Sequence, residues 1–178
     1  MADGYRGVFG AFPYAFREGD SLLFKLYVVF GTLAAAFVGI LFTFSLIVWI
    51  AETAGSPGGS LTLSRTFIVV VGLFAAGPLI APVLLVARKH RKGLGYHPRY
   101  DTIIALTGVA FLVSLYVAAI ISMPESFELD GETIERPPAS GISGPLVSVL
   151  YALPQPAAIA PPAIMLAGMG LAHYLLSR

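Results

Sequence analysis

Apolar residues follow one another along this chain in long runs, and charged residues are confined to the gaps between the runs. Stretches of 26, 22, 23 and 41 residues carry no Asp, Glu, Lys or Arg, and they lie between Lys25 and Glu52, Arg65 and Arg88, Asp101 and Glu125, and Arg136 and Arg178. A helix needs about 20 apolar residues to cross roughly 30 Å of hydrocarbon. The pattern therefore predicts an all-α membrane protein, a bundle of four transmembrane helices at about 26–51, 66–87, 102–123 and 157–176.

Composition agrees with a membrane protein. The chain is 57% hydrophobic and 12% charged, whereas an average soluble domain is roughly 45–50% apolar and about 25% charged. It has no cysteine, which excludes disulfides, iron–sulfur clusters, thiolate metal sites and cysteine nucleophiles. The apolar run after Lys25 exceeds the roughly 7–15 residues of a signal-peptide core, so we expect the first span to remain as a helix.

Basic residues are unevenly divided between the two sides of the predicted spans. Four spans place both ends of the chain on the side that also receives the segment between the second and third spans. That side carries nine basic residues, and the other side carries two, Arg65 and Arg136. Because basic residues are retained in the cytoplasm, we expect a multi-pass protein of the cell membrane with both termini cytoplasmic.

The segment 1–24 precedes the transmembrane domain, 25–178, and is rich in glycine and aromatic residues. This mixture is typical of an interfacial segment on the cytoplasmic membrane surface. Pro13 divides it, so we expect two short pieces rather than one helix. At the start of the second span, the hydroxyl of Thr62 or Ser64 is a candidate helix cap.

The exterior acidic loop, 124–144, alternates apolar and polar residues around an Asp-Gly pair at 130–131, which predicts a small hairpin. A continuous helix from there to the end of the chain would be about 50 Å long, too long for the bilayer. Four prolines interrupt it: Pro154, Pro156, Pro161 and Pro162. We therefore expect a short helix over 145–153, either interfacial or re-entrant, then a kink and the last span.

Small residues recur at four-residue spacing on every span and would let helices approach closely. They are Gly31, Ala35, Gly39 and Thr43 in the first span, Gly72 and Ala76 in the second, Ala110, Ser114, Ala118 and Ser122 in the third, and Gly168 and Ala172 in the fourth. Each stripe is either an internal seam or a contact with a partner subunit. Replacing Gly39 by Leu should disrupt whichever contact exists.

The predicted spans contain no Asp, Glu, Lys or Arg. Coupled carriers, pumps and voltage sensors generally use intramembrane charges, so the sequence disfavours them and leaves a pore or facilitator open. Prolines free backbone carbonyls, and the candidate hinges are Pro78, Pro82, Pro154 and Pro156. Hydroxyl groups such as those of Thr43, Thr107 and Ser114 either line a path or bond back to their own helices.

The last span places Met165, Met169 and His173 on one helical face. The remaining histidines, His90 and His97, lie in the predicted cytoplasmic segment, so we expect an interfacial, hydrogen-bonded histidine rather than a haem ligand. The sequence identifies no catalytic residue, no cofactor-binding residue and no metal ligand.

The segment between the second and third spans has the densest charge in the chain. It is a candidate contact for anionic lipid head groups or an acidic cytoplasmic partner, or it serves orientation alone, and its basic residues are Arg88, Lys89, Arg91, Lys92 and Arg99. Five charges beside a membrane do not form a folded basic surface, so no nucleic-acid partner is expected.

The chain opens with the phrase Gly-Tyr-Arg-Gly-Val-Phe-Gly-Ala-Phe-Pro-Tyr-Ala-Phe, from Gly4 to Phe16. It also has alanine-rich spans, eight Arg against three Lys, and the acidic exterior loop. In these features the chain resembles uncharacterised four-helix integral membrane proteins of halophilic archaea. The resemblance covers most of the chain and implies the same four-helix fold. It implies no catalytic residue and no cofactor.

Three functions are compatible with these patterns. The leading hypothesis is a non-enzymatic accessory or structural subunit of a membrane complex, whose partners are membrane lipids and another membrane protein or itself. The second is a small pore or facilitator that uses the proline-broken helices. The third is a lipid-modifying membrane enzyme, which requires a cluster of acidic or histidine residues near one interface; the sequence shows only scattered candidates, such as Asp101 beside Arg99 and His97.

Overall fold

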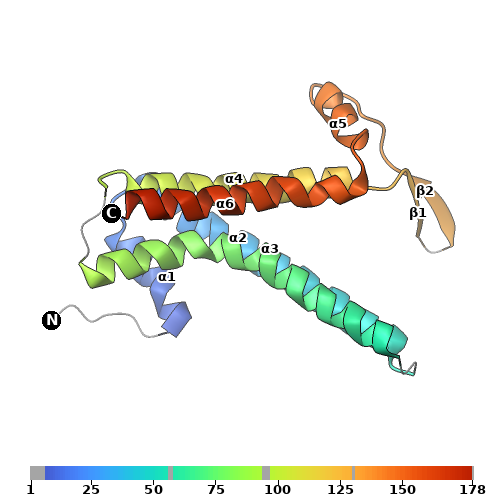
Figure 1. Cartoon of the computed structure of the whole chain (residues 1–178), viewed down its shortest axis with the longest axis horizontal. Coiled ribbons are helices and arrows are strands. Elements are labelled where there is room, and N and C mark those ends of the chain that lie inside the picture. Colours follow the sequence, from blue (N-terminus) through green and yellow to red (C-terminus); the bar gives the residue numbers. More distant parts are fainter. Residues whose placement is uncertain (1–6, 56–57, 94–96, 130, 178) are drawn as a thin grey trace. The chain divides into compact units, whose positions relative to one another are not determined.

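The computed structural model describes residues 7–55, 58–93, 97–129 and 131–177. In chain order, its elements are α1 (Gly7–Glu18), α2 (Leu22–Thr53), α3 (Gly59–Lys92), α4 (Tyr100–Ser122), β1 (Ser126–Leu129), β2 (Glu132–Glu135), α5 (Gly144–Tyr151), the 3₁₀ helix η1 (Gln155–Ile159) and α6 (Ala160–Leu176) (Figure 1). Apart from one two-stranded hairpin, the regular structure in these ranges is helical. The expected all-α fold is confirmed.

Four stretches are long and apolar enough to cross a membrane, which confirms the predicted number of spans. They are Leu22–Thr53, Leu61–Lys92, Tyr100–Ser122 and Gln155–Leu176. Helix α2 has 32 residues, which at 1.5 Å per residue is about 48 Å. Since the hydrocarbon core is roughly 30 Å thick, α2 is long enough to tilt within the bilayer or to project beyond it.

The chain divides into two compact units. Unit 1 comprises Met1–Val109 and Met169–Arg178, and unit 2 comprises Ala110–Gly168. Helices α4 and α6 each contribute residues to both units.

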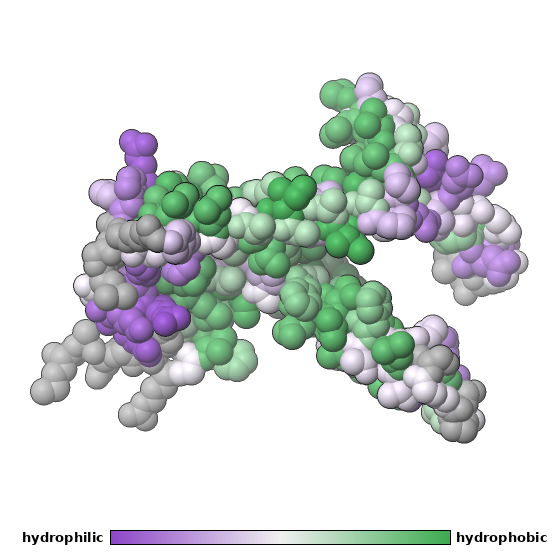
Figure 2. All heavy atoms as spheres, viewed as in Figure 1, coloured by the Kyte–Doolittle hydropathy of each residue, from purple (hydrophilic) through white to green (hydrophobic). Residues whose placement is uncertain are grey.

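In unit 1, α2 and α3 pack side by side and α1 packs against α3 (Figure 1). Figure 2 shows apolar surface along the long helices and polar residues gathered where α3 ends. The buried core draws on α1, α2, α3 and the first turns of α4, and its members are Ala11, Ala15, Phe24, Tyr27, Val28, Val83, Val86, Ala87, Tyr100, Ile104 and Ala105. These elements are therefore held by one apolar cluster.

Helix α1 corrects one expectation. It is a single helix with Pro13 inside it, so the prediction of two short pieces was wrong. Pro13 lacks the N–H that would bond the carbonyl of Phe9. Ala11 and Ala15 on this helix are fully buried in the core, and the packing of that face outweighs one lost hydrogen bond.

Helix α3 is longer than predicted at both ends. It begins at Gly59 with the extended Gly58 as its N-cap and no side-chain cap, so the expectation that Thr62 or Ser64 caps it was wrong. The Thr62 hydroxyl instead donates to the carbonyl of Gly58 at 3.4 Å. At the other end, the helix continues through Lys92 and stops at Gly93, whose φ of +57° is the left-handed conformation that favours glycine.

Unit 2 contains the predicted hairpin. β1 and β2 are antiparallel, with Phe127 opposite Ile134, and Gly131 in the turn has a φ of +84°. The hairpin is held at its base by a hydrogen bond of 3.0 Å from the N–H of Arg136 to the carbonyl of Glu125.

The proline-rich end of unit 2 also behaves largely as expected. The predicted short helix is α5, and η1 follows it before α6. Pro161 and Pro162 lie in the first turn of α6, where a missing N–H costs no helical hydrogen bond. These two prolines therefore begin the last helix, and the break lies at Pro154, which precedes η1, and Pro156 within it.

Candidate functional site

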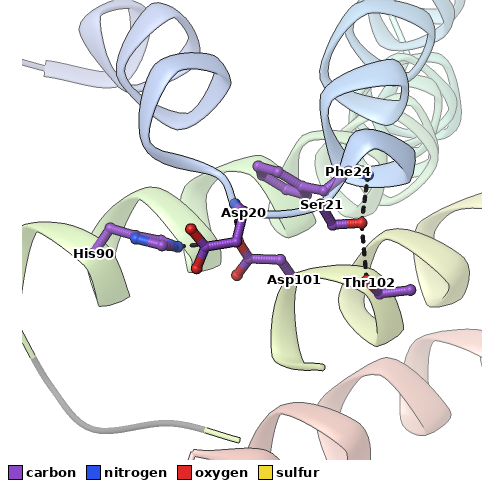
Figure 3. Close-up of polar contacts among 6 residues, drawn as sticks. All are labelled: Asp20, Ser21, Phe24, His90, Asp101 and Thr102. Atoms are coloured by element: carbon purple, nitrogen blue, oxygen red, sulfur yellow. Dashed lines mark hydrogen bonds and ion pairs between the residues drawn. The ribbon is translucent and has the colours of Figure 1, made fainter. Parts of the chain in front are cut away.

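Polar side chains from three segments meet at the end of unit 1 where α1 joins α2, α3 ends and α4 begins (Figure 3). We call this group the polar cluster, and its members are Asp20, Ser21, His90, Asp101 and Thr102. All of them lie just beyond or at the end of a predicted span.

Asp101, in the first turn of α4, is the centre of the polar cluster. It is only 3% exposed. Its Oδ2 atom lies 3.0 Å from Nε2 of His90 and accepts a hydrogen bond of 3.1 Å from the backbone N–H of Asp20. One carboxylate oxygen therefore links α4 to the end of α3 and to the α1–α2 connection.

The α1–α2 connection is tight because of Gly19. A Cβ atom at this position would lie 2.6 Å from Cδ1 of Phe24 and 2.9 Å from the carbonyl oxygen of Ala15. Only glycine fits between the two without displacing backbone or a buried ring. This close turn brings Asp20 to Asp101.

A second link joins the same segments. Ser21 is the N-cap of α2, and its hydroxyl accepts from the N–H of Phe24 at 3.4 Å. Thr102 in turn donates its hydroxyl proton to Oγ of Ser21 at 2.8 Å. The cap of one helix is thus held by the first turn of another.

Three side chains of the polar cluster lie close enough together to be candidate ligands of one metal ion. Each of Asp20, His90 and Asp101 offers one ligand atom, and these three atoms lie within 4.8 Å of one another. Oδ1 of Asp101 is buried and has no hydrogen-bond partner in the described structure. None of the three was predicted as a metal ligand from the sequence, although each stands at the same predicted side of a different span.

Beside the polar cluster, the end of α6 is tied to α3 and α4. The hydroxyl of Tyr100 lies 2.8 Å from Nδ1 of His173. Lys89 donates to the carbonyl of Ser177 at 3.1 Å, and its Nζ lies 5.5 Å from the centroid of the Tyr100 ring. His173 is therefore a hydrogen-bonded histidine, as expected.

The five basic candidates separate into two kinds. Lys89 is 6% exposed and faces the protein, whereas the other four are exposed: Arg88, Arg91, Lys92 and Arg99. A pocket of about 250 Å³ lies between α3 and α6, lined by Leu85, Arg88, Lys89, Lys92, His173 and Ser177. It brings together basic side chains that the sequence only placed in one segment.

The small-residue stripes of unit 1 are partly occupied within the chain. Gly31 and Ala35 are buried, and a Cβ at Gly31 would lie 2.8 Å from the Tyr27 ring of the same helix. A Cβ at Gly72 would lie 2.9 Å from Cγ of Phe42, so α2 and α3 approach each other closely at Gly72. A Cβ at Gly39 would meet nothing within 4 Å. Ala172 packs against the core of unit 1.

The other stripe residues lie in unit 2. Ser114 is buried, while Ala110 and Ala118 are half-buried and Gly168 is exposed. Their role as a partner seam stays a prediction.

The structure places two of the candidate hinges and three of the candidate path-lining hydroxyls, while the role of the prolines as hinges stays a prediction. Helix α3 is continuous through Pro78 and Pro82, and both prolines are buried. Three span hydroxyls donate to carbonyls of their own helices: Thr43 to Gly39 at 2.7 Å, Thr107 to Ile104 at 2.8 Å, and Ser114 to Phe111 at 2.6 Å. Of the two interpretations of these hydroxyls, the structure shows the bonded one.

Four long apolar helices, with polar groups gathered where three of them begin or end, define an α-helical multi-pass membrane protein. The chain belongs to the family described as Domain of unknown function (DUF8056), whose family model matches residues 1–177. No match to the chain is found among curated proteins or among solved structures.

Proposed function

We propose that the protein is a non-enzymatic accessory or structural subunit of a membrane complex in the cell membrane, with both termini cytoplasmic. The observation that carries this proposal is Gly39. It continues the small-residue stripe of α2, but a Cβ there would meet nothing within 4 Å, whereas Gly31 and Gly72 face an aromatic ring within 3 Å. A glycine on an apolar helix that leaves such space permits close approach of another helix.

The bonded hydroxyls support a packing role over conduction. The hydroxyls of Thr43 and Thr107 donate hydrogen bonds to carbonyls of their own helices. Because the proton is used in that bond, the hydroxyl is a poorer hydrogen-bond donor to a passing solute. The alternative of a small pore or facilitator therefore has less support from these side chains.

The test is Gly39→Leu in the full chain, extracted from its native membrane in mild detergent, with the mass and composition of the particle measured. We expect the wild type to carry a second membrane protein in fixed stoichiometry and Gly39→Leu to lose it without a change in thermal stability. Gly77→Leu is the matched control. A Cβ at Gly77 also meets nothing within 4 Å, but Gly77 is not a member of any small-residue stripe.

Other outcomes of this test contradict the proposal. A wild-type particle that contains one chain and no companion would exclude a subunit role under these conditions. An oligomer of this chain alone would favour the pore. Equal loss of the companion in Gly39→Leu and Gly77→Leu would remove Gly39 as the contact.

On the cytoplasmic side we propose anionic lipids as further partners. The pocket between α3 and α6 has an apolar wall at Leu85 and cationic groups at Arg88, Lys89 and Lys92, a combination suited to the head group and first methylenes of an acidic lipid. In nanodiscs of mixed lipids, Arg88→Gln with Lys92→Gln should reduce retention of acidic lipid. Arg99→Gln, which removes a charge outside the pocket, should not.

A specific observation also favours the third hypothesis, a lipid-modifying enzyme. Such an enzyme needs acidic and histidine side chains together near one interface, and His90 and Asp101 are in contact at 3.0 Å. The test is turnover of defined phospholipids by the purified chain, with loss of product in His90→Gln. Absence of turnover in the wild type would exclude this candidate for those lipids.

A further inference from the structure

We propose that Asp20, His90 and Asp101 bind one divalent transition-metal ion, of the Mn²⁺ or Zn²⁺ type. Each residue offers one ligand atom, and these atoms lie within 4.8 Å of one another. Metal–ligand bonds of about 2.0–2.2 Å place neighbouring ligands of one ion roughly 3–4 Å apart. Small side-chain rotations therefore suffice to close the three groups around an ion.

The buried carboxylate of Asp101 is an independent indication. Oδ2 is hydrogen-bonded, but Oδ1 is buried without a partner among the described residues. A buried polar atom without a partner is costly and calls for a bound species to satisfy it. Figure 3 shows the Asp101 carboxylate directed toward Asp20 and His90. A carboxylate binds a cation through one or both of its oxygens, so an ion at this position can satisfy the unpartnered Oδ1.

Charge balance also favours a cation at this position. Two carboxylates at this separation repel each other, and a divalent ion neutralises both. The neighbouring Lys89 does not face the site, because it donates to the carbonyl of Ser177. Arg88 and Lys92 are exposed, where solvent and salt screen their charge.

The ligand types indicate the class of metal. An imidazole nitrogen favours transition metals over Mg²⁺ or Ca²⁺, and carboxylates accept Mn²⁺ and Zn²⁺ alike. In the metal-bound form, Nε2 of His90 carries no proton and Nδ1 carries it. Asp20 is exposed, so the ion keeps an open side for water beside this ligand.

The site would fix the ends of several helices at once. Its ligands come from the α1–α2 connection, the end of α3 and the first turn of α4. Because the ion binds the folded arrangement and not a separated one, binding stabilises the packing of these segments. This role does not depend on the proposed subunit function.

The experiment uses the full chain in nanodiscs, stripped with a chelator and titrated with Mn²⁺ alone. Bound Mn²⁺ is counted by electron paramagnetic resonance, and pulsed measurements report coupling to a directly bound ¹⁴N nucleus. We expect one Mn²⁺ per chain with one imidazole coupling, and a higher unfolding temperature in the loaded protein.

Matched variants decide whether this is the site. Asp20→Asn changes an exposed side chain, so it should fold normally and weaken binding about tenfold or more, the equivalent of one lost ligand contact. His90→Gln should abolish the ¹⁴N coupling. The controls are Glu18→Gln, an exposed carboxylate nearby on α1, and His97→Gln, an exposed histidine, and both should bind as the wild type does.

The proposal is overturned by any of three results. These are no saturable Mn²⁺ binding to the wild type, a ¹⁴N coupling that persists in His90→Gln, or an affinity in Asp20→Asn equal to that in Glu18→Gln. None of these results depends on a companion subunit.

Discussion

The hydroxyl of Tyr27 on α2 donates a hydrogen bond of 2.6 Å to the carbonyl oxygen of Leu79 on α3. Leu79 lies between Pro78 and Pro82 in α3, but neither proline removes its helical donor, which in an α-helix is the N–H of Val83. A carbonyl oxygen has two lone pairs, so that of Leu79 can accept from Tyr27 in addition to its helical bond. The Tyr27 ring also occupies the space that a Cβ would need at Gly108, so one tyrosine joins three helices of unit 1.

Tyr27→Phe should lower the stability of unit 1 by about 1 kcal/mol, the net value of one hydrogen bond between membrane helices. The loss arises because the Leu79 carbonyl loses its external donor while the aromatic packing remains. The midpoint of unfolding in a detergent-to-SDS titration measures it. Tyr116→Phe is the control, since Tyr116 is 69% exposed; a similar loss there would show that the Leu79 bond is not responsible.

Gly108→Ala should destabilise more strongly, by about 1–3 kcal/mol, as expected for overpacking. A methyl group on Gly108 would overlap the Tyr27 ring, which is buried and bonded at its hydroxyl. The same SDS titration measures the change. Gly77→Ala provides the comparison, because a Cβ there meets nothing within 4 Å, and an equal shift in both variants would contradict the close contact with Tyr27.

Ser21→Ala removes both the N-cap of α2 and the acceptor of the Thr102 hydroxyl. Loss of an N-cap costs about 0.5–2 kcal/mol, so we expect a shift of this size in the unfolding midpoint. Amide hydrogen exchange should rise in the first turn of α2. Ser140→Ala changes an exposed serine outside any helix or strand and should leave both measurements unchanged.

The orientation of the chain is tested by cysteine labelling, which is simple here because the protein has no cysteine. In intact cells, a membrane-impermeant maleimide should label Ser140→Cys and should label Glu18→Cys only after the membrane is opened. The reason is the excess of basic residues on the side of the termini. Labelling of Glu18→Cys in intact cells would reverse the assignment.

Much of the fold was predictable because uncharged runs are a strong local signal. The four spans, the hairpin around Gly131 and the short helix before Pro154 all follow from spacing and turn residues. The single helix α1 was not predictable from Pro13, since burial of Ala11 and Ala15 decides it. Helix ends such as Gly58 depend on backbone geometry that composition does not reveal.

The polar cluster was partly visible in the sequence. Asp20, His90 and Asp101 each occur at the edge of a span on the same predicted side, so their common depth in the membrane could be inferred. Which way each side chain turns around its helix axis could not, because that depends on packing such as the close turn at Gly19. From the sequence alone, His90 was therefore only one more polar residue of a basic segment.

The long sequence separation within the polar cluster has a consequence for biosynthesis. Asp20 and Asp101 are 81 positions apart, so the cluster cannot close until the ribosome has delivered the start of the third span. A span inserted upside down would carry its residue to the opposite face of the bilayer, roughly 30 Å away. The closed cluster therefore forms only in a chain in which the start of α2, the end of α3 and the start of α4 lie at the same face of the membrane.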